Sequence, residues 1–191
     1  MKYTILKKLE EHFPHYVSGE AISEMLGVSR TAIWKHINEL RKEGYIIESS
    51  SKKGYRLQVL PDVLNVHEIK KGLETRILGR EIECFESISS TNTYAKEIAQ
   101  KGCKDGTVVV ANCQTQGRGR LGRQWNSEPG KGIWMSVVLK PEILPQDIQI
   151  ITLAAAVAVV KAIKAATGIE TGIKWPNDII LDGKKLCGIL T

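Results

Sequence analysis

The chain is poor in cysteine. It has four cysteines in 191 residues, and they form no C-x-x-C pair: Cys84, Cys103, Cys113 and Cys187. Zinc sites and disulfide frameworks both require clustered cysteines, or cysteines beside histidines. We therefore expect neither kind of site, and the composition is typical of a protein from a reducing cytosol.

The sequence also lacks a long hydrophobic run. The longest, Ile150 to Val160, is interrupted by Thr152 and is shorter than the ~20 apolar residues that cross a bilayer. The N-terminal residues enter an amphipathic pattern directly, without the apolar core of a secretory signal. We expect a soluble, cytoplasmic protein.

Positive charge is in only modest excess over negative charge. The formal net charge is +6 and the pI is about 9.1, which favours anionic partners but is also typical of a solubilising surface. With 42% hydrophobic and 25% charged residues, the chain has enough material for one core or for two unequal domains. The patterns below favour two domains.

Residues 1–60 have the pattern of a winged helix-turn-helix domain. Serines stand at two predicted helix starts, a glycine separates the helices, and a polar basic tip joins two short strands. The pattern predicts helices at 5–13, 18–27 and 29–44 and strands at 45–48 and 54–57. Such a domain binds DNA by placing its third helix in the major groove.

Candidate DNA-binding residues lie on the second and third helices and on the wing. They are Gly19, Ser29, Arg30, Thr31, Trp34, Lys35, His36, Asn38, Lys52 and Lys53. Two alternatives stay open. A three-helix unit also serves as a dimerisation or docking module, in which these lysines are simply solvated. Trp34 either faces the groove or packs against a neighbouring element.

The second domain is expected to begin at Leu60-Pro61-Asp62 and to cover residues 61–191, because proline ends the strand and the pattern then changes. Helices and strands are mixed along it, which predicts an α+β domain with a mixed sheet. The predicted elements are helices at 66–73, 91–100 and 145–167, and extended segments at 81–88, 106–114, 132–140, 172–175, 179–181 and 185–190.

The most informative segment is the loop Gly117-Arg118-Gly119-Arg120-Leu121-Gly122-Arg123. Its glycines let the backbone approach a ligand while guanidinium groups converge on it, as a nucleotide phosphate requires. The G-x-G-x-x-G within it does not open a helix, and no Walker A motif is present, so a dinucleotide fold and a P-loop are excluded. A basic loop without a ligand is the remaining alternative, although such a segment is costly to order.

Three motifs give the chain a specific resemblance. The segment from Gly117 to Trp125, Ser90-Thr91-Asn92 before it, and Lys174 to Asp178 with Gly183 to Leu190 after it resemble biotin protein ligases. The winged module narrows this to the bifunctional type, the biotin operon repressors, whereas lipoate ligases share only the general catalytic fold. The resemblance implies a class II synthetase-like mixed-sheet catalytic domain. That domain would be incomplete here, because full ligases continue beyond Thr191.

The resemblance implies an ATP-dependent ligase. Biotin and MgATP would form biotinyl-5'-AMP and pyrophosphate, and a lysine on a biotin carboxyl carrier protein, of acetyl-CoA carboxylase or a related carboxylase, would then attack the adenylate. It also implies a repressor of biotin genes, in which the adenylate promotes a homodimer on operator DNA. The alternative is a DNA-binding regulator or an inactive remnant without ligase activity.

The family's motifs imply residue roles. Biotin would be held by Ser90, Thr91, Asn92, Gln114, Arg118, Gly119, Arg120 and Lys185. The nucleotide would be held by Gly117, Arg118, Arg120, Arg123, Trp125, Asn177 and Lys185. Catalysis would use Arg118, Arg120, Lys185 and Asp178, because two anions meet when a carboxylate attacks a phosphate. Asp178 is also the candidate magnesium ligand, with the capping of a turn as its alternative role.

Overall fold

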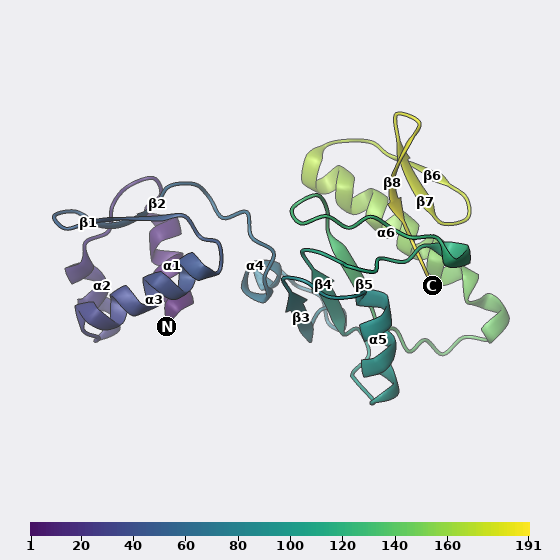
Figure 1. The fold of residues 1–191 in the computed structure, drawn as a ribbon, viewed down its shortest axis with the longest axis horizontal. Coiled ribbons are helices and arrows are strands. Elements are labelled where there is room, and N and C mark those ends of the chain that lie inside the picture. Colours follow the sequence, from purple (N-terminus) through teal and green to yellow (C-terminus); the bar gives the residue numbers. More distant parts are fainter. The chain divides into compact units, whose positions relative to one another are not determined.

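The computed structural model describes residues 1–191, the side chain of Pro145 excepted, and divides into two compact units, Met1–Glu74 and Thr75–Thr191 (Figure 1). The first unit is mainly helical, with one small sheet. Its elements are α1 (Lys2–Glu11), α2 (Gly19–Leu26), α3 (Arg30–Lys42), β1 (Ile47–Ser50), β2 (Gly54–Leu57) and α4 (Val66–Lys70).

Local sequence signals account for the helix ends of the first unit. The Ser18 hydroxyl accepts a hydrogen bond from the Ala21 amide at 3.0 Å, and Ser29 caps α3 in the same way. Gly27 ends α2 in the left-handed conformation at φ 63°, which glycine adopts without strain. Strands β1 and β2 pair antiparallel and form the wing. The predicted helix, turn, helix and wing are thus all present.

The first unit has a closed hydrophobic core. The stripe Ile33, Ile37 and Leu40, predicted from helical spacing, has no exposed surface. It packs with equally buried side chains of α1 and α2 and with β2, namely Ile5, Leu6, Leu9, Ile22 and Leu57. Each such side chain stabilises the fold by about 1.5–3 kcal/mol relative to exposure. The orientation of α3 therefore follows from its buried face.

The boundary between the units differs from the one expected at residue 60. Residues 61–74 pack with the first unit: Asn65 donates a hydrogen bond to the Tyr45 hydroxyl at 3.0 Å, and that hydroxyl donates to Glu68 at 2.7 Å. His67 stacks on the Tyr3 ring at a centroid distance of 3.9 Å. The wing strand also ends earlier than Pro61 suggested, at Leu57. These later side chains nevertheless contact α1 and the end of α3, which no local signal reveals.

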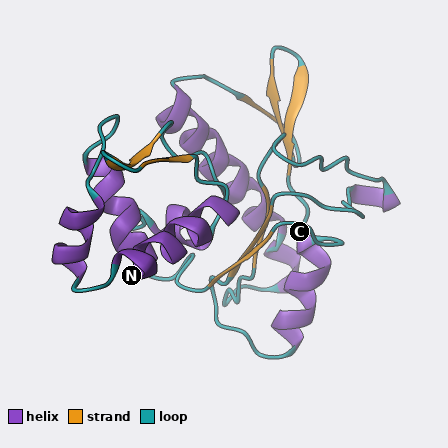
Figure 2. Cartoon of the chain, turned by 60° about the vertical axis from the view of Figure 1, so that its left-hand side comes forward, coloured by secondary structure: helices purple, strands orange, loops and turns teal.

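The second unit holds two small sheets, two α-helices and two short 3-10 helices (Figure 2). Its elements are β3 (Ile82–Phe85), α5 (Thr91–Gln100), β4 (Val108–Ala111), η1 (Arg120–Gly122), β5 (Trp134–Val137), η2 (Pro145–Asp147), α6 (Gln149–Thr167), β6 (Gly172–Lys174), β7 (Asp178–Leu181) and β8 (Lys184–Gly188). Strand β4 pairs parallel with β3 and antiparallel with β5, so the predicted mixed sheet is present. Strands β6, β7 and β8 form a separate antiparallel meander.

Helix α5 positions the site by packing on the mixed sheet. Its Ala95 and Ile98 form a small core with Val109 of β4 and with Val138. Val109 is completely buried, as its place in an apolar run predicted. The N-terminus of α5 therefore has a defined position relative to the end of β4, where the glycine and arginine loop begins.

Helix α6 contacts β6 and β7. It is the one described helix that is long and apolar enough to cross a membrane by length and composition, although its apolar run was expected to be too short. The difference arises because Ala162, Ile163, Ala165 and Ala166 continue the apolar segment beyond Lys161 and Lys164. Thr152 and Ala156 are buried, and the Thr152 hydroxyl lies 2.9 Å from that of Thr191. Ile150, Leu153 and Val157 remain exposed.

Candidate functional site

The glycine and arginine loop is folded back on itself. The Gly119 amide donates to the Arg123 carbonyl at 2.7 Å, and the Trp125 amide donates to the Gly117 carbonyl at 2.9 Å. Its tip is the 3-10 turn η1, where Leu121 has a φ of 57° and is 90% exposed. The basic segment is therefore an ordered hairpin-like turn that presents its side chains outward.

Gly117 is required by close packing at the base of this loop. A Cβ atom there would lie 2.3 Å from the Trp125 carbonyl oxygen and 2.7 Å from the Ser127 Oγ. Both distances are well inside van der Waals contact, and the first partner is backbone. Glycine at this position thus lets the two arms of the loop pack together. The sequence pattern had singled out Gly117 for ligand binding, whereas the structure shows that packing also requires it.

A network of polar side chains connects the loop to the start of α5. The amide and hydroxyl of Thr91 donate to Gln114 Oε1 at 2.8 and 3.0 Å, and Gln114 Nε2 donates to Ser127 Oγ at 2.9 Å. Ser136 Oγ donates to Thr91 Oγ1 at 3.0 Å. The structure thus brings together Thr91 and Gln114, both expected at the biotin site.

Two members of this network, Ser127 and Ser136, were not identified from the sequence. Ser127 is 3% exposed and sits where the loop returns, while Ser136 lies on β5 opposite Val109 of β4. Isolated serines in a loop and a strand are common, so the residues themselves carried no signal. Only the fold shows that Ser127 contacts Gln114 and that Ser136 contacts Thr91.

The side chains of Ser90 and Thr91 have little exposed surface. They are 2% and 3% exposed, and Ser90 Oγ accepts from the Thr93 amide at 3.4 Å as the N-cap of α5. Asn92 instead lines a cavity of about 920 Å³ beside the loop. Arg118, Arg123 and Trp125 line the same cavity. Its volume suits a small organic ligand.

The meander brings a second group of residues to the loop. Lys185 Nζ lies 2.7 Å from Asp178 Oδ1 and 4.9 Å from the centre of a Trp125 ring. The Lys185–Asp178 contact is an ion pair whose angles do not meet those of a hydrogen bond. The Lys185–Trp125 contact is a cation–π interaction. Arg120 Nη1 donates to Asn177 Oδ1 at 2.9 Å. Residues from three separate motifs therefore meet.

Asp178 is the one carboxylate among the residues that meet beside the loop, which bears on whether a metal ion could bind there. Among the residues that the structure describes, no group of three or more histidine, cysteine, aspartate or glutamate side chains is arranged to hold a metal ion. Mg²⁺ in nucleotide sites is bound through one or two carboxylates and the substrate phosphates. A single carboxylate such as Asp178 could therefore bind Mg²⁺ only together with phosphates of this kind.

Near Lys185, Cys187 is half-buried on β8. Burial raises the pKa of the Cys187 thiol, although Lys185 acts in the opposite direction. The thiol is the less nucleophilic form of cysteine. The arrangement therefore favours acid–base and electrostatic chemistry by Lys185, Asp178 and the arginines over covalent catalysis by this cysteine.

The first unit presents a separate candidate surface on α3 and the wing. Arg30, Thr31, Trp34 and Lys35 are exposed on α3, and Trp34 is 57% exposed. This exposure favours the groove-facing alternative for Trp34. Lys52 and Lys53 are exposed at the tip between β1 and β2, where Lys53 Nζ lies 5.6 Å from the Tyr16 ring centre.

Two expected DNA-binding residues of α3 have internal partners. His36 Nδ1 lies 3.1 Å from Glu39 Oε2, and this contact lowers the pKa of the Glu39 carboxyl. Arg41 donates to Asn38 Oδ1 at 3.1 Å. His36 and Asn38 are also partly buried, so they are less available to a base edge than their helical spacing predicted.

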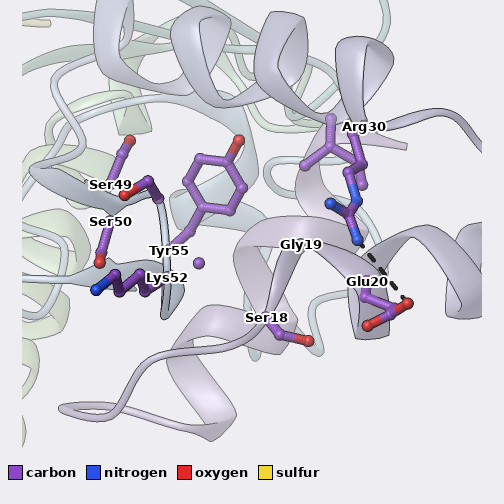
Figure 3. Close-up of a pocket in the computed structure, with 11 residues that line it drawn as sticks. Ser18, Gly19, Glu20, Arg30, Ser49, Ser50, Lys52 and Tyr55 are labelled. Carbon is purple, nitrogen blue, oxygen red and sulfur yellow. Dashed lines mark ion pairs between the residues drawn. The ribbon is translucent and has the colours of Figure 1, made fainter.

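A cavity of about 320 Å³ lies between the wing and the N-termini of α2 and α3 (Figure 3). Ser18 and Gly19, at the start of α2, line it together with Lys52. Arg30 points toward Glu20 in the close-up, and their charged atoms are 3.8 Å apart. Gly19, Arg30 and Lys52 thus line one cavity. The Ser29 hydroxyl instead accepts the capping hydrogen bond from the Ala32 amide.

Comparisons with known proteins agree with both parts of the chain. The model of the biotin/lipoate A/B protein ligase family matches residues 84–191, and that of an HTH domain matches residues 2–56. The bifunctional ligase/repressor BirA of Bacillus spizizenii is 51% identical over 195 residues, covering 100% of this chain and 60% of its own length. The chain thus spans about 60% of that relative.

Solved structures resemble the second part of the chain. The biotin protein ligase from Aquifex aeolicus in complex with biotin and ATP aligns with a TM-score of 0.51 and 33% identity, over 58% of this chain and 46% of that one. The ligase from Leishmania major in complex with biotinyl-5-AMP aligns with a TM-score of 0.50 and 29% identity, over 58% and 51%. On the match over residues 84–191, the chain belongs to the biotin/lipoate A/B protein ligase family.

Proposed function

We propose that the chain carries the adenylate-forming site of an ATP-dependent biotin protein ligase, joined to a DNA-binding repressor module. One observation carries the ligase proposal. The folded loop meets Lys185, Asp178 and Asn177 of the meander on one side and the Thr91–Gln114 network on the other. Its substrates would be biotin and ATP, which the Aquifex aeolicus ligase binds. Mg²⁺ and a lysine of a biotin carboxyl carrier protein are added from the resemblance of the motifs.

The cations of the site suit attack of a carboxylate on the α-phosphate of ATP. That step brings two anions together, so it is accelerated by positive groups that are already oriented. Arg118 lines the cavity, whereas Arg120 and Lys185 are outside its lining and contact Asn177 and Asp178 of the meander. We assign these three residues to charge neutralisation of biotin's carboxylate and the phosphate.

The ion pair between Lys185 and Asp178 gives each residue a partner before substrates bind. When a phosphate replaces Asp178 as the partner of Lys185, the freed carboxylate becomes available to a magnesium ion or to the attacking lysine amine. Magnesium would supply further neutralisation of phosphate charge. The release of Asp178 from Lys185 would thereby couple nucleotide binding to the transfer of biotin to the carrier lysine.

The neutral part of the site suits the uncharged ring of biotin. Gln114 and Thr91 hold donors and acceptors in fixed orientation beneath the loop, and Asn92 projects into the cavity. Trp125 offers an aromatic face to the nucleotide, together with the Gly117 and Arg123 segment of the loop. A loop closed over an acyl adenylate shields the labile anhydride from water.

Biotin-dependent exchange of pyrophosphate into ATP tests the ligase proposal. The expected result is exchange that requires biotin and magnesium and is strongly reduced by Lys185→Ala. Because the chain spans about 60% of its BirA relative, the same assay is run on a protein extended to full ligase length. Absence of exchange from both proteins overturns the proposal.

A second function, binding of operator DNA, is favoured by the closed core of the first unit and by its exposed basic face on α3 and the wing. We assign DNA binding to the first unit, Met1–Glu74, and the ligase part to the second, Thr75–Thr191. The protein would act in the cytoplasm as a ligand-promoted homodimer that represses biotin genes. Gel-shift titrations with and without biotin and ATP test this. Binding to no duplex in either condition overturns it.

A regulator without ligase activity is the alternative to the bifunctional protein. It predicts operator binding that is indifferent to biotin and ATP, together with no pyrophosphate exchange. The bifunctional protein predicts tighter operator binding when the adenylate forms. The two assays therefore separate these functions.

A further inference from the structure

Trp34 is a large apolar side chain left in solvent on an otherwise well-packed helix. Its neighbour Ile33 is completely buried, as are Ile37 and Leu40 on the same face, whereas Trp34 is 57% exposed. At 3.6 residues per turn, Arg30 and Thr31 lie on the face of α3 that carries Trp34, whereas Lys35 is rotated by about 100° from it. The indole therefore belongs to the outward face of the helix.

The fold of the first unit does not use this ring. The aromatic contacts recorded in the described part of that unit join Tyr3 to His67 and place cationic side chains over Tyr3 or Tyr16, and none involves Trp34. An exposed tryptophan adds little to stability, yet it offers a rigid contact area with only two side-chain torsions. We therefore look for its partner outside the unit.

The charges around Trp34 identify the chemistry of that partner. Arg30 and Lys35 are exposed on the same helix, and Lys52 and Lys53 are exposed on the wing. Arg30 lies 3.8 Å from Glu20, but an apolar protein surface would give the three lysines no anionic partner. A DNA duplex supplies phosphates to all four cations and a groove to the helix. Within the major groove, the apolar group on a base edge is the 5-methyl group of thymine.

We propose that Trp34 is a specificity-determining residue, which packs its indole against the 5-methyl group of one thymine in the major groove. The inference rests on the proposed DNA binding and adds the base that one side chain selects. Arg30, Lys35 and the wing lysines would position α3 through phosphates, and Trp34 would discriminate thymine from the other bases.

The test removes the methyl group without changing any hydrogen bond. A bound duplex is first selected from a random library with the 191-residue chain. Each thymine is then replaced in turn by deoxyuridine, and dissociation constants are measured at fixed salt. We expect one replacement, or a symmetry-related pair, to weaken binding about fourfold, the effect of one buried methyl group. Other replacements should have no effect.

Two variants connect that effect to Trp34. Trp34→Ala should bind the thymine duplex about tenfold more weakly and should not distinguish it from the deoxyuridine duplex. Trp34→Phe keeps an apolar ring but loses the indole N–H, so it should retain the discrimination. Ile46→Ala is the matched control, because Ile46 is 52% exposed and lies outside α3. It should behave as the parent chain.

Several results overturn the inference. They are a parent chain indifferent to every deoxyuridine, a Trp34→Ala variant that still discriminates, and a Trp34→Phe variant that does not, which would show that an apolar ring at this position is not enough to read the methyl group. A change in oligomeric state with unchanged DNA binding in Trp34→Ala would assign the ring to a protein contact. If the parent chain binds no duplex, the proposed DNA binding fails, and that result is distinct from all of these.

Discussion

Arg120 Nη1 and Asn177 Oδ1 are 2.9 Å apart, and the hydrogen bond between them joins residues 57 positions apart in the chain. Asn177 is itself fixed, because its Nδ2 donates to the Ile189 carbonyl at 3.0 Å and its carbonyl accepts from the Ile189 amide. The tip of the glycine and arginine loop is thus tied to the β6–β7 turn and to the end of β8. The folded position of the loop depends on the meander.

Asn177→Ala should loosen the loop. One exposed hydrogen bond contributes about 0.5–1.5 kcal/mol, so we expect trypsin to cleave after the loop arginines roughly two- to tenfold faster. Time courses of cleavage, read by mass spectrometry, measure this. Asn126→Ala is the matched control, since Asn126 bonds only to nearby Glu128 in the same region. Equal cleavage rates in the two variants would contradict the role assigned to Asn177.

Gly117→Ala should disrupt the base of the loop, because its Cβ would lie 2.3 Å from the Trp125 carbonyl oxygen. Relief of such overlap typically costs about 1–3 kcal/mol. We expect a lower unfolding temperature for the second unit and faster tryptic cleavage of the loop. Gly119→Ala is the control, because its nearest neighbour would be 3.4 Å away. A Gly117→Ala variant as stable as Gly119→Ala would refute the packing argument.

Lys185→Ala and Arg118→Ala should each reduce adenylate formation by roughly 2–4 kcal/mol in transition-state terms, the effect of losing one preorganised electrostatic group. Biotin-dependent pyrophosphate exchange measures it. Lys184→Ala is the control, because Lys184 is an exposed neighbour on the same strand. Rates near the parent value for Lys185→Ala would remove it from the catalytic group.

The wing of the first unit should lose stability at low pH through Glu48. A hydrogen bond from the Tyr16 hydroxyl, and then those from Arg56, lower the pKa of the Glu48 carboxyl from 4.5 to about 2. Because the folded value is the lower one, the stabilisation is complete above pH ~4.5 and is lost as the pH falls through about 2. Thermal unfolding between these pH values measures the loss.

Glu48→Gln should flatten that dependence, since an amide does not titrate. Glu24→Gln, which changes an exposed glutamate of α2, should leave it unchanged. If both variants show the same pH profile as the parent chain, the Tyr16–Glu48–Arg56 cluster does not stabilise the wing.

Lys52→Ala should weaken DNA binding without changing the preferred sequence. Loss of one phosphate contact reduces the slope of log affinity against log salt by about 0.9. Titrations at several salt concentrations give this slope. Lys7→Ala, on the exposed side of α1, is the control and should keep the parent slope. An unchanged slope in Lys52→Ala would exclude the wing tip from the interface.

Local patterns predicted much of the fold. The Ser18 and Ser29 caps, the buried stripe of α3 and the buried strand β4 all agree with the structure, because each depends on neighbours within about one or two helical turns or on strand alternation. The unit boundary could not be predicted in this way. It depends on the contacts of Tyr45 with Asn65 and Glu68, which are distant in sequence.

The candidate site shows the same division. Arg118, Arg120, Lys185 and Gln114 were identified from residue type and motif, since convergent cations and glycines have a chemistry of their own. Ser127 and Ser136 could not be found, because a serine acquires its role only from what it faces. His36 and Asn38 were predicted to bind DNA, and only the structure shows that their side chains contact Glu39 and Arg41.

The amino-acid sequence by itself determined the family, the two kinds of unit and the residues that carry charge, because these depend on composition and short-range order. Tertiary structure alone decided which of those residues meet. It placed Lys185 against Asp178 and Trp125, tied Arg120 to Asn177, buried Thr91 under Gln114 and left Trp34 in solvent. The physical reason is that side-chain contacts between distant segments are set by how strands register and helices pack, which no local pattern encodes.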